Sequence, residues 1–364
     1  AGVVISASHN PAEDNGLKFL TSGGIKLSDE TESEIERSMA AAVTDRFAAA
    51  AGQDSAAAPA AGDFAADAAL GRRYLDQLLA PRDFSGAPAD FRVVVDGANG
   101  AASPLLPELA RRLPFRVELV CVSPDGRNIN RGCGATSPDR LSREVLAAKA
   151  RLGLALDGDG DRIAACDALG RPLDGDALLY IFARYLDRSG RLEGRTVTGT
   201  VMTNMGLEAA LSRAGIRLQR VPVGDRHIQE CLMRHRFTLG GEPSGHIIIR
   251  PPAITGDGLL AGLFLLEILC RTGQTPAELL AGYQPFPAKI INLPAARRVA
   301  LDDLPPLREL LRLVDAPPPG SARAVVRYSG TEPLLRIMLE AERLDELLDQ
   351  AAPLFEAIRR HLNP

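Results

Sequence analysis

The sequence contains no tryptophan, and aromatic residues of all kinds make up only 4% of it. Such scarcity argues against a stacking platform for sugars or bases as the main binding device. Positive charge is not in excess either, because the formal net charge is −4, and this excludes a basic nucleic-acid surface as the main function. Since no apolar run reaches the ~20 residues that a membrane span needs, we expect neither nucleic acid nor membrane as a partner.

Cysteine is sparse as well. The five cysteines form no C-x-x-C pair and lie at Cys121, Cys133, Cys166, Cys231 and Cys270. An odd number without paired spacing is typical of a reduced compartment rather than of a disulfide framework. We therefore expect a cytoplasmic protein.

The chain begins with Ala1 directly on an apolar strand, Gly2-Val3-Val4-Ile5, with no basic segment or cleavage pattern before it. We therefore expect no signal peptide in this sequence. The strand has the composition of a central strand, yet it has no sequence-adjacent partner. We therefore expect an N-terminally truncated fragment.

From about residue 71 onward, apolar strands alternate with amphipathic helices, a pattern typical of layered α/β domains. Strands are expected at 92–95, 116–122, 152–156, 163–166, 197–202, 217–223 and 246–250, and helices at 140–151, 175–188, 205–214, 225–234 and 257–272. Residues 288–361 read strand, helix, two strands and helix, which predicts a smaller α+β domain. A helix is also expected at 29–42 with Ser28 as its N-cap, and the alanine-rich stretch 47–69 is a linker or weak helix.

The strongest motif is Asp157-Gly158-Asp159-Gly160-Asp161-Arg162, between two apolar strands. The interleaved glycines permit a tight turn, so we expect the three carboxylates to converge. Carboxylates this close repel one another unless a cation lies among them. Oxygen-only ligands favour a hard cation, and Mg²⁺ is the usual one in phosphate chemistry. The alternatives are a solvated acidic turn and a calcium loop, and the EF-hand pattern does not fit because Ala168 stands at its twelfth position.

A second motif, Ser6-Ala7-Ser8-His9-Asn10-Pro11, follows the first strand and precedes Lys18. Ser8 is expected at the strand end with an accessible hydroxyl. Ser8 and His9 are adjacent, so we expect their side chains to diverge rather than to form a dyad. In isolation, the serine is a turn residue and the lysine a surface residue.

Two further loops carry polar groups between apolar strands. The first runs from Gly240 to His246 and can present a carboxylate, a hydroxyl and an imidazole to a polyol, or it is simply a tight connection. The second, Arg327-Tyr328-Ser329-Gly330-Thr331-Glu332-Pro333, has Arg336 on the strand after it. Free backbone N–H groups, hydroxyls and arginines make a phosphate cradle, and the alternative is a β-turn with two surface arginines. The turn Val223-Gly224-Asp225-Arg226 is weaker, since Asp225 serves equally well as a helix N-cap.

Together and in this order, the exposed serine, the three-aspartate loop, the polyol-reading loop and the phosphate cradle resemble the α-D-phosphohexomutase family. The resemblance covers essentially all 364 residues. It implies consecutive α/β domains followed by a smaller C-terminal α+β domain, with boundaries at 1–60, 61–168, 169–285 and 286–364. Within the family, the serine run, the Val223–Arg226 turn and the Ser329–Pro333 run resemble the branch that acts on glucosamine phosphate.

The resemblance also implies a mechanism in which a phosphosugar is the substrate. Ser8 would be carried as phosphoserine, and its phosphate would hold Mg²⁺ together with the carboxylates of Asp157, Asp159 and Asp161. Lys18 would act as general acid/base or charge stabiliser, and a depressed pKa from nearby cations would suit the first role. His9 and Arg162 would assist it. The sugar-binding residues would be Arg226, Glu242, Ser244 and His246, and the phosphate-binding residues Arg327, Ser329, Gly330, Thr331 and Arg336.

The resemblance implies a glucose- or glucosamine-1,6-bisphosphate as activator. It leaves open whether the protein forms a homodimer. Pro243 stands where relatives usually carry a polar or longer side chain, which leaves the exact hexose open. The alternatives are a phosphomannomutase/phosphoglucomutase of the same family, a metal-dependent phosphatase with Asp157 as nucleophile, and a non-catalytic phosphosugar-binding protein.

Overall fold

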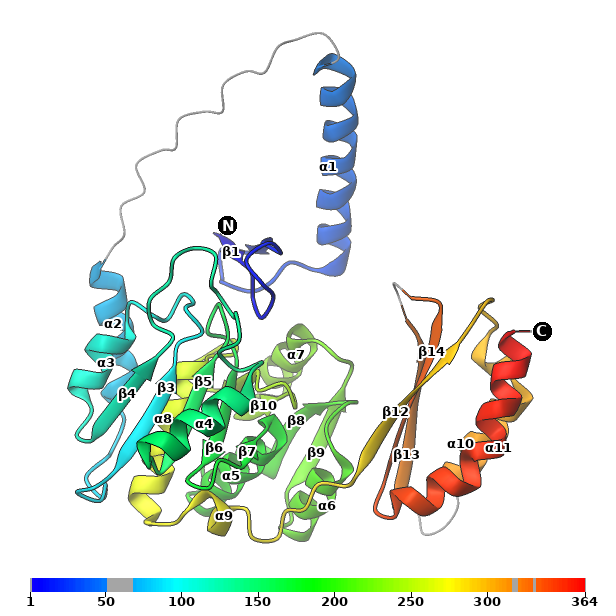
Figure 1. Ribbon diagram of the computed structural model, residues 1–364. Coiled ribbons are helices and arrows are strands. Elements are labelled where there is room, and N and C mark those ends of the chain that lie inside the picture. The colour runs from blue at the N-terminus through cyan, green and yellow to red at the C-terminus, as the bar shows by residue number, and fades with distance from the viewer. Residues whose placement is uncertain (1, 51–67, 316–319, 330–331, 364) are drawn as a thin grey trace. The chain divides into compact units, whose positions relative to one another are not determined.

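The computed structural model describes residues 2–50, 68–315, 320–329 and 332–363 (Figure 1). The chain divides into two units. Unit 1 comprises Ala1–Pro172 and Asp257–Gly273, and unit 2 comprises Leu173–Gly256 and Gln274–Pro364. One helix is therefore contributed to unit 1 by a segment far along the chain.

Unit 1 begins with a two-stranded antiparallel hairpin and continues with a five-stranded sheet of order β4-β3-β5-β6-β7. Its elements are β1 (Gly2–Ser6), β2 (Gly16–Leu20), α1 (Asp29–Ala50), α2 (Ala68–Leu79), β3 (Arg92–Asp96), α3 (Leu106–Arg112), β4 (Arg116–Val120), α4 (Pro138–Ala148), β5 (Leu152–Leu156), β6 (Ile163–Asp167), β7 (Pro172–Leu173) and α8 (Gly258–Thr272). β3 pairs in parallel with β4 and β5, and β6 closes on β5 antiparallel. Parallel pairing places the carboxyl ends of β3, β4 and β5 at one edge of the sheet, where ligands bind in open α/β folds.

The inner strands β3, β5 and β6 are largely buried on both faces, as their apolar runs predict. β5 is buried throughout, and α4 covers one of its faces with Leu141 and Val145. α8 is apolar around its whole circumference, with residues 258–270 buried, and it packs on β5 and β6. Its carboxylate Glu267 is buried but paired with Arg82 at 2.8 Å.

The first part of unit 2 contains a four-stranded sheet of order β11-β10-β8-β9. Its elements are α5 (Gly175–Arg188), the 3-10 turn η1 (Glu193–Arg195), β8 (Thr196–Thr200), α6 (Met205–Arg213), β9 (Arg217–Val221), α7 (Asp225–His235), β10 (Leu239–Gly241), β11 (Ile247–Ile249) and α9 (Pro276–Leu279). The β8–β9 and β8–β10 pairs are parallel and the β10–β11 pair is antiparallel. This is the topology of β4-β3-β5-β6 repeated, so the β10–β11 connection corresponds to the β5–β6 connection that carries the three aspartates.

The last part of unit 2 is a three-stranded antiparallel sheet of order β12-β14-β13. Its elements are β12 (Ala288–Pro294), the 3-10 turn η2 (Leu301–Asp303), α10 (Pro305–Val314), β13 (Ala322–Tyr328), β14 (Leu334–Ala341) and α11 (Leu344–Leu362). α10 and α11 cover one face of this sheet, as Figure 1 shows, around the buried residues Leu335, Ile337 and Leu339. Because side chains alternate along a strand, Arg336 and Met338 lie on the opposite face.

The expected α/β order with a smaller α+β end is confirmed, and the helix at 175–188 and the strand at 152–156 have the expected bounds. Ser28 caps α1, since its Oγ accepts a hydrogen bond from Thr31 N. One expectation is wrong, because β1 does have a sequence-adjacent partner: β2 pairs with it over its full length. α3 escaped prediction because its seven residues carry too short an apolar pattern. Residues 51–67 of the expected linker lie outside the described residues.

No helix in the described part of the chain combines the length and the apolar character needed to cross a membrane.

Candidate active site

The aspartate loop connects β5 to β6 at the carboxyl edge of the unit 1 sheet. One carboxylate oxygen from each of Asp157, Asp159 and Asp161 lies within 4.8 Å of the others. Asp157 is fully buried, and its Oδ1 accepts a hydrogen bond from Arg162 N at 3.1 Å. The expected convergence of the three carboxylates is therefore confirmed.

These carboxylates have the chemistry of a cation site. Asp157 Oδ2 and Asp159 Oδ1 are buried and accept no hydrogen bond from the residues that the structure describes. Burial, and then the charges of Asp161 and Asp159, raise the pKa of Asp157 to about 7. A dication would relieve both the desolvation and the repulsion, and an all-oxygen donor set of this kind fits Mg²⁺.

The serine loop, residues 7–15 between β1 and β2, is connected to the aspartate loop by hydrogen bonds of Ser6. Ser6 Oγ donates to Asp159 Oδ2 at 2.7 Å and accepts from Ser8 N at 2.8 Å. One side chain thus joins the backbone of Ser8 to a candidate metal ligand. Ser6 lies inside the serine motif, but no local sequence pattern predicts its contact with Asp159, which is 153 positions away.

Ser8 has a φ of +51°, in the left-handed region that non-glycine residues seldom adopt. This turn breaks the alternation of the strand and brings Ser8 Oγ to 3.4 Å from His9 Nδ1. The expectation that the two side chains diverge is therefore wrong. Burial, and then the nearby Arg162, lower the pKa of His9, which favours the neutral ring, the form that can accept a proton from the hydroxyl.

Lys18, on β2, is held against the aspartate loop. Its Nζ lies 2.6 Å from Asp159 Oδ2 and 3.5 Å from Asp161 Oδ2. Burial lowers the pKa of Lys18, but the two carboxylates outweigh burial and raise it above its ordinary value. The depressed pKa expected for a general base is therefore wrong, because the nearest charges are negative rather than positive.

Asn130 is a second residue that sequence reasoning missed. Its Nδ2 donates to Ser8 O at 2.8 Å and to Asn10 O at 2.7 Å. Its own N–H donates to Ala98 O at 2.9 Å, in the loop after β3. Asn130 thereby ties the serine loop to the sheet edge, and no local sequence pattern marks a contact over 120 residues.

Arg162 follows the aspartates, with its Nε 3.9 Å from both Asp157 Oδ2 and Asp161 Oδ1. This Nε is buried without a hydrogen-bond acceptor among the described residues. A guanidinium in this position is available to an anionic group bound beside the aspartates.

Removing the Ser6 hydroxyl tests the connection between the two loops. We expect Ser6→Ala to lower kcat by about tenfold to a hundredfold, the usual cost of losing a group that orients a metal ligand. Ser6→Thr keeps the hydroxyl and should recover most of the rate, which distinguishes positioning from a general packing defect. A wild-type kcat in Ser6→Ala would contradict this role.

Gly100 packs against the aspartate loop so closely that a side chain does not fit. A Cβ there would lie 2.3 Å from Gly158 O, a backbone atom. We expect Gly100→Ala to lower the free energy of unfolding by about 1–3 kcal/mol, measured by urea denaturation. Gly23→Ala is the control, because its Cβ would meet nothing closer than 3.8 Å and should cost less than about 0.5 kcal/mol. Equal stability of the two variants would contradict the close packing.

In unit 2, the β10–β11 connection holds three of the four expected sugar-binding residues, Glu242, Ser244 and His246, of which Glu242 and Ser244 are the more exposed. Glu242 Oε1 accepts from Gly224 N at 3.1 Å, and Glu242 Oε2 accepts from Ser244 Oγ at 3.3 Å. Ser244 is exposed and Glu242 is half-buried. Both offer hydrogen-bonding atoms that suit sugar hydroxyls.

The other two expected sugar-binding residues are less open. His246 is only 2% exposed, and its Nε2 accepts from Gly256 N at 3.2 Å and lies 3.8 Å from Asp225 Oδ2. Arg226 donates through Nε to Glu230 Oε1 at 2.9 Å. The burial of His246 is typical of a residue that holds a loop in place.

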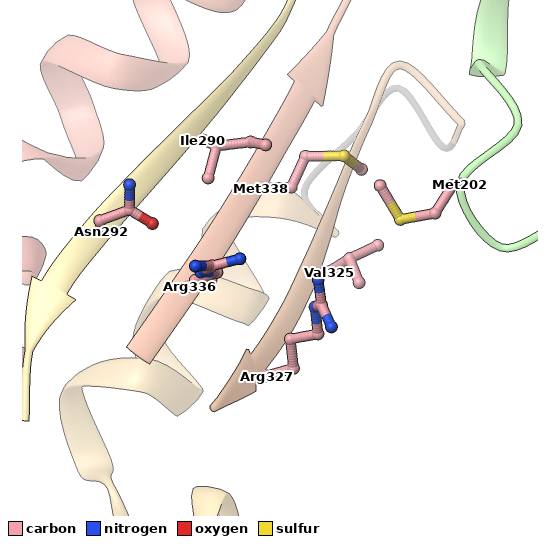
Figure 2. A pocket seen from close by; sticks show the side chains of 7 residues that line it. All are labelled: Met202, Ile290, Asn292, Val325, Arg327, Arg336 and Met338. Atoms are coloured by element: carbon pink, nitrogen blue, oxygen red, sulfur yellow. The ribbon is translucent and has the colours of Figure 1, made fainter. Parts of the chain in front are cut away.

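The face of the β12-β14-β13 sheet opposite α10 and α11 carries a pocket of about 310 Å³. One row of directly opposed residues across the three strands consists of Asn292, Arg336 and Arg327. The next row on the same face consists of Ile290, Met338 and Val325. Figure 2 shows Met202 facing the apolar row from a neighbouring segment, while both arginines lie at the other end. Two cationic side chains directly opposite each other repel, and an anion bound between them would remove that repulsion.

The neighbouring loop is described only in part. Ser329 is buried, and its Oγ accepts from Glu332 N at 3.3 Å. Arg336 forms an ion pair with Glu332. Gly330 and Thr331, both expected to bind phosphate, lie outside the described residues.

Comparison with known proteins gives matches along the chain. Four family models match, all described as domains of phosphoglucomutase/phosphomannomutase. The models for alpha/beta/alpha domains I, II and III match residues 1–46, 72–170 and 174–286, and the model for the C-terminal domain matches residues 319–357. The boundaries expected from the sequence stay a prediction.

Curated relatives are similar over nearly the whole chain. A phosphoglucosamine mutase from Heliobacterium modesticaldum is 41% identical, covering 99% of this chain and 80% of the relative. A phosphoglucosamine mutase from Marinomonas sp. is 41% identical, covering 96% of this chain and 76% of the relative. One from Myxococcus xanthus is 38% identical, covering 94% of this chain and 73% of the relative.

Solved structures share the fold. A phosphoglucomutase/phosphomannomutase family protein from Burkholderia thailandensis superposes with a TM-score of 0.74 at 23% identity, covering 100% of this chain and 76% of that chain. An Aspergillus fumigatus N-acetylphosphoglucosamine mutase, solved in complex with GlcNAc-6P and magnesium, superposes with a TM-score of 0.70 at 20% identity. The match covers 100% of this chain and 89% of that chain. A variant of that fungal enzyme was solved in complex with glucose 1,6-bisphosphate.

Proposed function

Because this chain belongs to the phosphoglucomutase/phosphomannomutase family, we propose that it interconverts glucosamine 6-phosphate and glucosamine 1-phosphate. Its curated relatives at about 40% identity are phosphoglucosamine mutases. The observation that carries the mechanism is the fastening of the serine loop to the aspartate loop through Ser6 and Asp159. The product, glucosamine 1-phosphate, would supply the synthesis of UDP-N-acetylglucosamine. A cytoplasmic location stays a prediction.

In the proposed mechanism Ser8 carries the phosphoryl group. The 1-hydroxyl of glucosamine 6-phosphate attacks the phosphorus of phosphoserine, and the bond to Ser8 Oγ breaks. The product is a 1,6-bisphosphate, whose 6-phosphoryl group then returns to Ser8 Oγ and leaves glucosamine 1-phosphate. A glucose- or glucosamine-1,6-bisphosphate would load the unphosphorylated serine, and the bisphosphate complex of the fungal relative is compatible with this role.

Asp157, Asp159 and Asp161 are the proposed holders of Mg²⁺, together with a phosphoserine oxygen. The ion, when bound, neutralises charge on the phosphoryl group during transfer. His9 Nδ1 lies 3.4 Å from Ser8 Oγ, so we assign it the proton that leaves or reaches this oxygen. The raised pKa of Lys18 favours charge stabilisation over proton abstraction, and Arg162 has the same role.

The residues of unit 2 are proposed to bind the substrate. Glu242 and Ser244 would read the sugar hydroxyls, with Arg226 beside them. For His246 we propose a positioning role, because its ring is buried and accepts a hydrogen bond from Gly256 N. Ser329, Gly330 and Thr331 would bind the phosphate that is not being transferred, with Arg327 and Arg336.

The arginine row gives a prediction for substrate binding. We expect Arg327→Ala to raise KM for the sugar phosphate by about tenfold to a hundredfold, since a hydrogen bond to a charged group contributes roughly 1.5–3 kcal/mol. A smaller effect on kcat is expected, because Ser8 is untouched. Arg312→Ala, at an exposed position of α10, is the control, and an equal KM in the two variants would contradict the phosphate role.

Substrate comparison tests the proposed function. kcat/KM is measured for glucosamine 6-phosphate, glucose 1-phosphate and mannose 6-phosphate with Mg²⁺ and a bisphosphate activator. A strong preference for glucosamine phosphate supports the proposal. Better use of glucose or mannose phosphate would move the chain to the sibling activity, with Pro243 the first residue to exchange. Inorganic phosphate released in excess of isomerised sugar would instead indicate a phosphatase.

A further inference from the structure

A second convergence of ligand atoms lies in unit 1, outside the proposed reaction centre. A carboxylate oxygen of Asp96 and the sulfurs of Cys121 and Cys133 lie within 4.8 Å of one another. Asp96 ends β3, and Cys121 directly follows the parallel neighbour β4. The three groups therefore meet at the carboxyl edge of the sheet, where open α/β folds bind their ligands.

The cluster is organised by its own contacts. Asp96 is fully buried, and its two oxygens accept from Ala98 N at 2.8 Å and Gly134 N at 2.9 Å. Cys133 is 1% exposed, and Asn99 Nδ2 donates to its sulfur at 3.8 Å. Such hydrogen bonds to a ligating sulfur and carboxylate orient the donors of metal sites.

We propose that Asp96, Cys121 and Cys133 bind a thiophilic divalent cation of the Zn²⁺ class. Two sulfurs among three donors select against Mg²⁺ and Ca²⁺, which take oxygen ligands. Zn²⁺ accepts cysteine and aspartate in one tetrahedral site and can complete it with a water. Cys121 is half-buried and is the most exposed member of the cluster.

A regulatory disulfide is the less favoured reading of the same pair, because a carboxylate oxygen of Asp96 converges with both sulfurs and a disulfide would not use it.

The bound cation would stiffen the segment that holds the serine loop. Cys133 lies between Gly134, which is bonded to Asp96, and Asn130, which donates to Ser8 O and Asn10 O. Asn130 N also bonds to Ala98 O, in the turn that Asp96 supports. Occupancy is therefore expected to raise the midpoint of thermal unfolding.

Co²⁺ is the test probe, because thiolate ligands give it a charge-transfer absorption that carboxylates do not. The whole chain is titrated with Co²⁺, and Zn²⁺ is then added as competitor, with excess Mg²⁺ occupying the aspartate loop throughout. We expect a saturable thiolate band at one equivalent, displaced by Zn²⁺, and a rise in the unfolding midpoint with Zn²⁺.

Variants locate the site. Cys133→Ser and Cys121→Ser should each weaken Co²⁺ binding by at least about tenfold and diminish the band. Cys121 is half-exposed, so its replacement keeps the test valid even if the Cys133 variant folds poorly. Cys231→Ser, at a half-buried thiol outside the cluster, is the matched control, and Asp159→Asn should retain the band. Absence of a thiolate band, or an unchanged band in Cys121→Ser, overturns the proposal.

Discussion

Ser8→Ala is expected to lower kcat by at least about a thousandfold. Removing the covalent nucleophile of an enzyme can cost even more than this. The proposed cycle passes every phosphoryl group through this oxygen, so no other side chain can substitute for it. Turnover is measured as the conversion of glucosamine 6-phosphate in the presence of Mg²⁺ and bisphosphate.

The fold should survive this substitution. The side-chain contact of Ser8 Oγ that the structure places is with His9, at 3.4 Å on the surface. Ser8 N and Ser8 O keep their bonds to Ser6 and Asn130. Ser22→Ala, at an exposed turn position, is the control for handling and should retain the wild-type rate. A Ser8→Ala enzyme near the wild-type rate would exclude the phosphoserine cycle.

Asp159→Asn is expected to have the next largest effect on kcat. Asp159 is a candidate metal ligand, accepts from Ser6 Oγ and pairs with Lys18 Nζ. Loss of the carboxylate charge would weaken Mg²⁺ binding and disturb both neighbours. Transition-state stabilisation by a metal is on the order of several kcal/mol, which corresponds to about a hundredfold or more in kcat.

The measurement is a Mg²⁺ titration of activity in the wild type and the variant. Chelation should abolish wild-type turnover, and added Mg²⁺ should restore it. Asp14→Asn, an exposed carboxylate of the same unit, should titrate like the wild type. Activity that is indifferent to chelator, or a Mg²⁺ dependence unchanged in Asp159→Asn, would contradict the metal role of the loop.

Local patterns in the sequence predicted the parts of the site whose chemistry is written in neighbouring residues. The Asp-Gly-Asp-Gly-Asp run predicted convergence, because glycines permit the tight turn and alternate spacing brings the carboxylates together. The strand-to-loop position of Ser8 was equally local. The α/β order followed from hydrophobic periodicity, which depends only on each segment.

Contacts between distant segments could not be predicted in this way. Asn130 reaches Ser8 O across 122 positions, and the row of Asn292, Arg336 and Arg327 depends on strand register. The pKa of Lys18 follows from Asp159, which is 141 positions away. His246 had the residue type of a ligand, but its burial is decided by packing against Gly256.

The direct test of the central claim is to locate the phosphoryl group on the protein. The chain is incubated with glucose 1,6-bisphosphate and Mg²⁺, the phosphorylated residue is identified by tandem mass spectrometry, and glucosamine 6-phosphate is then added in a single-turnover experiment. The account predicts phosphate on Ser8, lost as the sugar is added, with glucosamine 1-phosphate formed. Phosphate on Asp157, or sugar-phosphate isomerisation by a chain that never carries phosphate on Ser8, would contradict it.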